Sequence, residues 1–395
     1  MRGVDVVVTN LSKLPSAFFK LFFILLTTVN LSWVPFSAQA ATLPVDSVDI
    51  LYHSFEGGGM DINGPFVLVR KSIGSQVSVN GHYYVDSVSA ASIDVVTSGA
   101  SEYTEERTEL SAGVDFLHEK TMVSAGYTES EENDFLAKTV FMSVNQDFFG
   151  DLSKITMGYA RGWDEISKFG DEVINEADRQ NFKIGLSQIL TKNSLMGFDV
   201  ETATDEGFLR NPYRSYRILN DDKVGYTNEP ENYPETHTST AIAVRGLYYL
   251  PYRASIKAEY RFFSDNWGVK ANTYELLYVH PLGKSWTLEA KLRYYEQTQA
   301  DFYSDLFKAD TQEFKARDKE LSTFSDVTYG AGVTYELGKG FIPYINKLKF
   351  TLLADYLEFD YDNFRDASDT SLVAGTEPFY HFSAWVTRAS ITLEY

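Results

Sequence analysis

The chain has 395 residues, no cysteine, 15% aromatic side chains and a formal net charge of −20. Without cysteine it can form no disulfide, thiolate metal site or covalent c-type haem attachment. So strong a negative charge argues against a nucleic acid partner, because binding to phosphates needs Lys and Arg.

The N-terminal segment predicts an export signal that is cleaved. Three basic residues precede an apolar run at 21–40, which ends in the small–x–small pattern of Ala38 and Ala40. The run is short and interrupted by polar and proline residues, which disfavours the alternative of a membrane anchor. We expect cleavage after Ala40, which leaves residues 41–395 as one exported domain.

The exported part repeats a single pattern, in which about ten residues alternate between apolar and polar and a turn follows. At 286–295, for example, Leu288 and Leu292 fall on one face, and Glu289 and Lys291 fall on the other. This period of two is typical of a β-strand with two different faces. The same split recurs at 182–187, 254–263 and 327–337.

Two features distinguish a membrane barrel from a soluble sandwich. Charges of both signs stand at mid-strand on one face, and the apolar face carries aromatic residues toward its ends, as expected if that face meets lipid. A soluble sandwich would bury its apolar face against a second sheet. The connections also alternate between short ones, at 151–153, 191–193, 251–253 and 281–285, and long ones, at 164–177, 207–236, 298–322 and 362–378.

We therefore predict an all-β fold, a single antiparallel transmembrane β-barrel with short periplasmic turns and long outer loops. About sixteen strands are expected, and fourteen is the alternative because the first two are the least regular. In chain order they are 46–56, 66–74, 76–88, 105–117, 121–130, 135–148, 153–163, 178–190, 194–206, 238–250, 254–264, 270–280, 285–297, 323–337, 347–360 and 381–395.

The last predicted strand ends the chain on an aromatic residue. Ile391, Leu393 and Tyr395 share its apolar face. This resembles the C-terminal signal that the barrel-insertion machinery reads in outer-membrane proteins. The alternative is an ordinary edge strand, although soluble sheets normally blunt their edges.

Four segments carry a resemblance to a known family: 51–71, 83–109, 148–165 and 177–194. They resemble a family of Gram-negative proteins that is catalogued as a domain of unknown function and described as predicted outer-membrane β-barrels. The resemblance covers most of the exported chain and is densest between about 50 and 215. It implies no catalytic residues. The genes of this family lie near those of thioredoxin-like proteins and small lipoproteins. The resemblance therefore implies an alternative role in an extracytoplasmic redox system.

Two local motifs are better explained as ordinary loops than as binding sites. The glycine run at 57–64 lacks the Lys-Ser/Thr of a nucleotide-binding loop and is followed by Pro65, so we expect a tight outer loop. An acidic cluster contains Glu129, Glu131, Glu132 and Asp134. Calcium binding by these carboxylates is conceivable, but their spacing matches no EF-hand, and a solvated loop is favoured.

The six histidines show no helical spacing typical of a zinc protease. A barrel hydrolase would need a histidine near a nucleophile or an acid on a neighbouring strand, such as His82 near Ser111 or Asp115. We predict no enzyme activity, and a barrel hydrolase remains the third alternative because the register is not fixed by the sequence.

Charges on the polar face are the main candidates for a functional role. They could create a transverse field that tunes selectivity, or they could pair with one another and fill the lumen. Both interpretations remain open. The candidates are Arg70, Arg107, Glu109, Asp115, Lys183, Asp199, Glu201, Arg245, Lys257, Glu259, Arg261, Glu289, Lys291, Arg293 and Arg388.

The sequence thus predicts an outer-membrane barrel with a polar lumen, acting as a porin-like passage or docking barrel. The alternative is a plugged structural partner of a periplasmic or lipoprotein complex. We expect outer-membrane lipids and the insertion machinery as partners, and neither cofactor nor metal.

Overall fold

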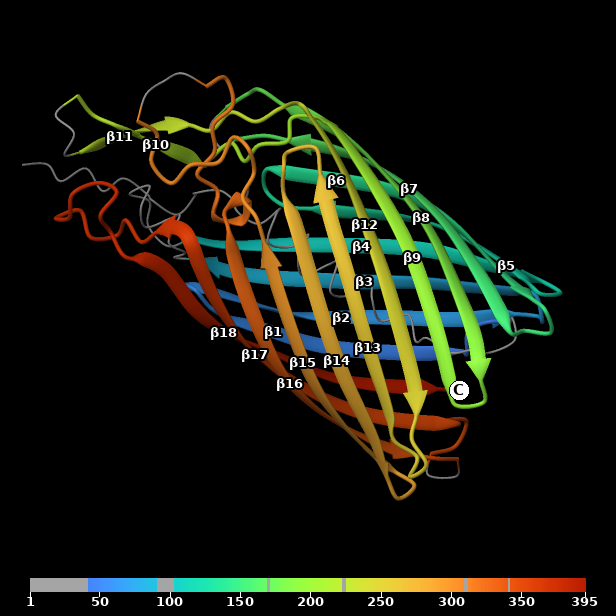
Figure 1. Ribbon diagram of the computed structural model, residues 1–395. Coiled ribbons are helices and arrows are strands. Elements are labelled where there is room, and N and C mark those ends of the chain that lie inside the picture. The colour runs from blue at the N-terminus through green and yellow to red at the C-terminus, as the bar shows by residue number, and fades with distance from the viewer. Residues whose placement is uncertain (1–41, 91–102, 169–170, 222–224, 309–311, 340–341) are drawn as a thin grey trace, which may run out of the picture.

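The computed structural model describes residues 42–90, 103–168, 171–221, 225–308, 312–339 and 342–395. The predicted cleavage signal at Ala38 and Ala40 lies outside these residues. Sixteen strands pair antiparallel and the last pairs with the first, which closes the barrel (Figure 1). The predicted fold class and the count of sixteen are therefore confirmed. In the described part of the chain, no helix has the length and hydropathy needed to cross a membrane.

The barrel strands follow one another around the wall in chain order, and a small sheet of β10 and β11 lies outside the barrel wall. The elements are β1 (Ser47–Gly57), β2 (Met60–Ile73), β3 (Val77–Ala90), β4 (Tyr103–His118), β5 (Thr121–Glu131), β6 (Phe135–Phe148), β7 (Ser153–Ile166), β8 (Asn175–Thr191), β9 (Ser194–Gly207), β10 (Ser215–Leu219), β11 (Tyr226–Pro230), β12 (Thr236–Tyr249), β13 (Ser255–Asp265), β14 (Lys270–Leu282), β15 (Trp286–Gln297), the 3₁₀ helix η2 (Lys319–Leu321), β16 (Phe324–Leu337), β17 (Lys347–Arg365) and β18 (Phe379–Glu394).

In the wall, apolar side chains are exposed and charged side chains are largely buried, which is the reverse of a soluble sheet. On β15, Leu288 and Leu292 are 41% and 47% exposed, whereas the side chains of Lys291 and Arg293 are 13% and 16% exposed. Because the sheet is closed, the exposed apolar face is the outside and the charged face lines the lumen. This arrangement is typical of a barrel whose outer surface meets lipid.

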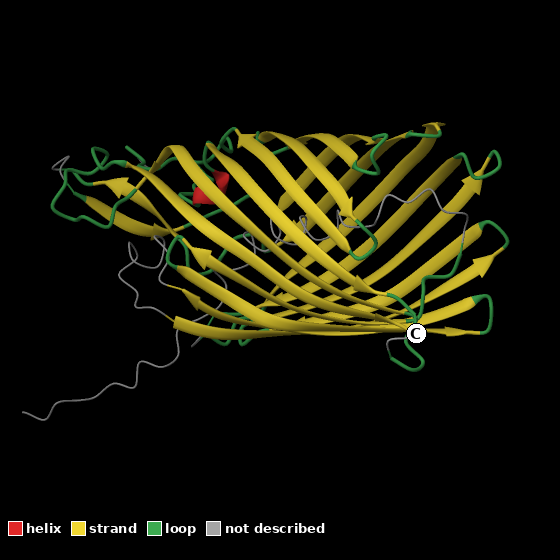
Figure 2. Ribbon diagram, turned by 90° about the horizontal axis from the view of Figure 1, so that it is seen from below, coloured by secondary structure: helices red, strands yellow, loops and turns green. Residues whose placement is uncertain are grey.

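The connections differ in length at the two ends of the barrel (Figure 2). The start of β1 and Tyr395 lie at the end with mostly short turns, such as 119–120 and 192–193. Loops 208–235, 298–323 and 366–378 emerge at the other end. The predicted alternation of connection lengths is present, and by that asymmetry the long loops face outward from the cell.

The expectation of a loop over residues 57–64 was wrong. The turn consists only of Gly58 and Gly59, whose φ angles are 60° and 76°, and β2 begins at Met60. A Cβ added at Gly64 would lie 1.7 Å from the carbonyl oxygen of Val85 on β3, so the chain needs glycine there. Pro65 fits inside the strand because the pairing of β2 with β3 is interrupted beside it, and its missing N–H leaves no gap in the ladder.

The seam between β1, β2 and β18 is held by the C-terminal residue. The Tyr395 backbone N–H donates to the carbonyl oxygen of Asp46 at 3.1 Å, and its hydroxyl donates to the carbonyl oxygen of Arg70 at 3.2 Å. Lys71 Nζ lies 4.6 Å from the centre of the Tyr395 ring and 2.5 Å from Asp46 Oδ2. The terminal aromatic residue is thus fixed to the segment that precedes β1.

This seam gives a pH prediction. The Lys71 side chain and the hydrogen bonds from Ser72 lower the pKa of Asp46 from 3.8 to about 2. A lowered pKa means that the contact stabilises the seam above about pH 4 and is lost as the pH falls through about 2. We expect NMR titration to give a midpoint near 2 for the Asp46 carboxyl, and a higher midpoint in Lys71→Met. Equal midpoints in the two proteins would show that Lys71 does not set this pKa.

Candidate functional site

The inner wall across β9, β12, β13 and β14 carries a chain of ion pairs. Arg245 contacts Asp199 at 2.6 Å and Glu259 at 2.8 Å. Lys257 continues the chain with contacts to Glu259 at 3.2 Å and Glu275 at 3.3 Å. Cations and carboxylates alternate along four strands, so each cation contacts two carboxylates on the wall.

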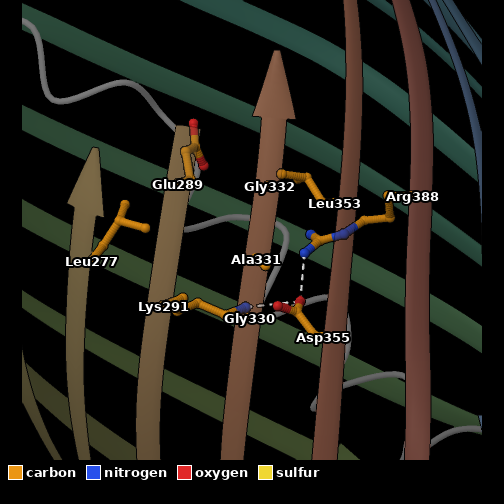
Figure 3. A pocket seen from close by; sticks show the side chains of 9 residues that line it. All are labelled: Leu277, Glu289, Lys291, Gly330, Ala331, Gly332, Leu353, Asp355 and Arg388. Atoms are coloured by element: carbon orange, nitrogen blue, oxygen red, sulfur yellow. Dashed lines mark hydrogen bonds and ion pairs between the residues drawn. The ribbon is translucent and has the colours of Figure 1, made fainter. Parts of the chain in front are cut away.

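A second group spans β15, β17 and β18 (Figure 3). Lys291 Nζ and Arg388 Nη2 lie 2.8 Å and 2.7 Å from the same oxygen, Oδ2 of Asp355. Lys291 reaches across β16 at Gly330, where an added Cβ would lie 2.3 Å from Asp355 Oδ1. The missing side chain of Gly330 therefore makes this contact between non-adjacent strands geometrically accessible.

The other charged candidates between β8 and β16 differ in how closely each approaches a carboxylate. Arg293 Nη1 lies 2.8 Å from Asp326 Oδ1, whose side chain is almost completely buried. Arg261 lies 3.9 Å from Glu201, and both side chains are about one-third exposed. Lys183 stands opposite Glu201 in the pairing of β8 with β9. Arg261 is thus held more loosely than Arg293.

On β2 to β4 the candidates also form contacts with one another. Arg70 Nη1 lies 2.5 Å from Asp115 Oδ2, and Arg107 Nη2 lies 3.5 Å from Glu109 Oε2. His82 stands opposite Ser111 in the register, as the hydrolase alternative requires. However, His82 Nε2 bonds to Glu109 at 2.9 Å, and the Ser111 hydroxyl donates to the carbonyl oxygen of Tyr127 at 3.1 Å. The two side chains therefore take other partners.

The long loops between β9 and β12, β15 and β16, and β17 and β18 form a folded unit, here called the cap. Arg217 on β10 is 2% exposed and joins all three loops. Its Nη2 lies 2.6 Å from Asp305 Oδ2, and its Nη1 lies 2.6 Å from Glu377 Oε1. Asp305 also accepts a hydrogen bond from Arg317 Nε at 3.1 Å. One buried guanidinium thus links segments that lie up to 160 residues apart.

A second polar group and an aromatic core complete the cap. Arg214 pairs with Asp318, and the Tyr233 hydroxyl donates to Glu231 Oε2 at 2.7 Å. The Tyr233 ring lies 5.7 Å from the ring of Trp267, in the β13–β14 turn, and is part of a buried cluster at the rim of the barrel. The cap therefore rests on the barrel wall through packed side chains.

The burial of these groups affects their protonation. Burial raises the pKa of Tyr233 well above its usual value, and the nearby Glu231 carboxylate raises it further. Burial also acts to raise the pKa of Glu377, but backbone hydrogen bonds and Arg217 outweigh it and hold that pKa below its usual range. Glu377 therefore remains an anion beside Arg217 at neutral pH.

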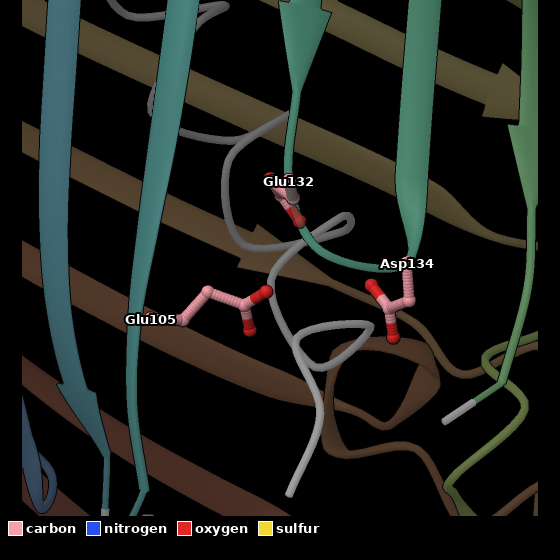
Figure 4. Close-up of side chains that lie close together, drawn as sticks. All are labelled: Glu105, Glu132 and Asp134. Carbon is pink, nitrogen blue, oxygen red and sulfur yellow. The ribbon is translucent and has the colours of Figure 1, made fainter. Parts of the chain in front are cut away.

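The predicted acidic cluster does not form one solvated loop. Glu129 and Glu131 belong to β5, while Glu132 and Asp134 turn toward Glu105 on β4 (Figure 4). Carboxylate oxygens of these last three residues lie within 4.8 Å of one another, and Glu105 and Asp134 are buried. Among the described residues they are the group whose ligand chemistry would suit a hard cation.

Sequence reasoning missed several residues of this site. Glu275 and Asp326 fall on the inward parity of their strands, so the alternation could have identified them as partners of Lys257 and Arg293. Arg217, Asp305 and Glu377 lie in loops, where no periodic pattern marks a residue as buried. Their role depends on the way the loops fold together.

Comparison with known families gives a partial match. Residues 175–363 match the model of a family described as "Protein of unknown function (DUF3570)". The predicted resemblance to a domain of unknown function is thereby confirmed. The match lies mostly C-terminal to the segment between about 50 and 215 in which the resemblance was expected to be densest. No curated protein matches the sequence.

Several solved structures are similar in outline. A bacterial polysaccharide outer membrane secretin has a TM-score of 0.48 at 9% identity, with 89% of this chain and 98% of that chain covered. Outer-membrane expressed OmpT of Vibrio cholerae has a TM-score of 0.40 at 9% identity, with 89% and 100% covered. A Pseudomonas aeruginosa FadL homologue has a TM-score of 0.39 at 11% identity, with 89% and 90% covered. With its closed sixteen-strand wall and exposed apolar outer face, the present chain is an outer-membrane β-barrel.

Proposed function

We propose that this barrel is a gated passage for small polar solutes, with the cap as the gate and no catalytic step. The observation that carries the proposal is the inner wall, which is lined by charges of both signs in a barrel of sixteen strands. Barrels of this size enclose an interior wide enough for water. The loops that form the cap stand at one end of the lumen, where they can regulate entry.

The second candidate is a plugged structural partner of a periplasmic or lipoprotein complex. The interlocked ion pairs of the cap and of the wall favour it, because paired charges can rigidify a lumen as well as tune it. In either role, we propose delivery to the outer membrane after cleavage behind Ala40, and insertion by machinery that reads Ile391, Leu393 and Tyr395.

Conductance in planar lipid bilayers tests the passage. We expect channels in the wild type, and a preference for cations that increases in Arg261→Glu, because this side chain is inward, partly exposed and loosely paired. Reversal changes the local charge by two units, so about 6 Å from the path in a watery lumen it changes the energy of a passing cation by about 1.4 kcal/mol, which is roughly a tenfold change in the permeability to cations. The readout is the reversal potential across a salt gradient.

Glu131→Lys is the control, because Glu131 is exposed at the end of β5 and its field is screened by salt. Reversal at this site should change the permeability ratio little. Absence of conductance, both in the wild type and after the cap is loosened, would favour the plugged structural partner. Equal effects of Arg261→Glu and Glu131→Lys would contradict a path along the inner wall.

A further inference from the structure

A recess in the inner wall lies between β14 and β18, over the bare backbone of β16 (Figure 3). Its floor is Gly330, Ala331 and Gly332, and the space encloses about 240 Å³, counting the part that opens to the lumen. Gly330 and Gly332 occupy positions of β16 that face the lumen, and they have no side chain. A solute can therefore approach the strand more closely here than beside larger residues.

One end of the recess is positively charged. Lys291 and Arg388 both contact Oδ2 of Asp355, which is a group of two cations and one carboxylate. The Asp355 side chain is only 9% exposed and packs against Gly330, so it lies beneath the two cations. The group therefore carries a net positive charge at the surface of the recess.

The opposite end is negatively charged. Glu289 lies two residues before Lys291 on β15, and Figure 3 shows its carboxylate directed away from the pair of Lys291 and Asp355. Within the described residues, no hydrogen bond joins the Glu289 carboxylate to another side chain, although Arg388 and Lys291 attract it electrostatically. A carboxylate in this position can accept hydrogen bonds from a bound solute.

We propose that this recess binds solutes that carry both an ammonium and a carboxylate, the class to which free amino acids belong. The ammonium is placed at Glu289 and the carboxylate at Lys291 and Arg388, while Leu277 and Leu353 contact the aliphatic part. A solute with a single charge satisfies only one end. The inference rests on the proposed passage, for which it names the solute class, but binding can be measured without transport.

Equilibrium binding to the full-length protein in detergent micelles tests the proposal, with L-alanine, acetate and methylammonium as probes in isothermal titration calorimetry. L-alanine should bind at least tenfold more tightly than either probe of single charge, a difference of about 1.4 kcal/mol. Glu289→Gln keeps the shape of the side chain, and should weaken alanine binding about tenfold while acetate binding stays unchanged.

Two further variants separate binding from folding. Glu201→Gln, an inward carboxylate on β9 outside the recess, is the matched control and should leave alanine binding unchanged. Gly332→Ala should weaken alanine binding by narrowing the recess, because the new Cβ would lie 2.4 Å from Leu353 Cδ2 and force that side chain to shift. Circular dichroism of each variant should match the wild-type barrel.

Several results would overturn the proposal: no detectable alanine binding, equal affinity for alanine and acetate, or no effect of Glu289→Gln. These outcomes differ from failure of the proposed passage. Alanine binding that depends on Glu289, in a barrel without conductance, would refute transport and retain the site. Conductance without alanine binding would refute the site and retain the passage.

Discussion

Replacing Arg217 with methionine should unfold the cap while the barrel stays intact. Methionine fills part of the space, but the carboxylates of Asp305 and Glu377 lose the cation that lies 2.6 Å from each of them. Removing one partner of a buried ion pair typically costs about 3–5 kcal/mol. Because Arg217 joins three loops and no barrel strand, we expect this loss within the cap alone.

Hydrogen–deuterium exchange by mass spectrometry measures the effect. Peptides from 208–221, 298–308 and 366–378 should lose protection in Arg217→Met, while strand peptides keep theirs. Conductance should rise if the cap is the gate. Arg210→Met is the matched control, because Arg210 donates one hydrogen bond to Asn232 at the partly exposed side of the same loop. Unchanged protection in Arg217→Met would mean that the apolar core alone holds the cap.

A double variant tests the electrostatic explanation separately. Adding Glu377→Gln to Arg217→Met removes one of the two carboxylates that have lost this cation, so it should recover part of the lost protection. If the double variant is as unstable as the sum of the single ones, the effect of Arg217→Met arises from lost packing and not from uncompensated charge.

Replacing Leu292 with arginine should destabilise the barrel in lipid. Leu292 is 47% exposed on the outer face of β15, between the aromatic residues Trp286 and Tyr294 that stand near the two ends of that face. An arginine on the lipid face costs about 2–4 kcal/mol near the membrane midplane. Urea unfolding from phospholipid vesicles, followed by tryptophan fluorescence, gives the free energy of unfolding.

Thr287→Arg on the same strand is the control for this prediction. Thr287 has the opposite parity and faces the lumen, where water can solvate a new charge, so we expect a loss well below that of Leu292→Arg. Equal losses at the two positions would contradict the assignment of the outer and inner faces.

The sequence alone determined where the strands lie and which way their side chains face. The physical reason is that apolar and polar residues must alternate with a period of two in a strand between lipid and a wet lumen. This alternation is visible in the sequence of each strand by itself. Leu288 and Lys291 could therefore be assigned to opposite faces without knowledge of any neighbouring strand. One clear error came at residues 57–64, where the glycine run was taken for a loop although β2 begins at Met60 and accommodates Pro65 through a local interruption of the ladder.

Tertiary structure alone decided which charges meet. The parity of Lys291, Asp355 and Arg388 followed from the alternation, but their contact depends on the register of four strands and on the absence of a side chain at Gly330. The contacts within the cap could not be predicted from the sequence, because Arg217 and Glu377 are separated by 160 residues and lie in loops without a periodic pattern. Alternation is a local property of the chain, whereas an ion pair between distant segments exists only once the closed barrel has brought their loops to the same rim.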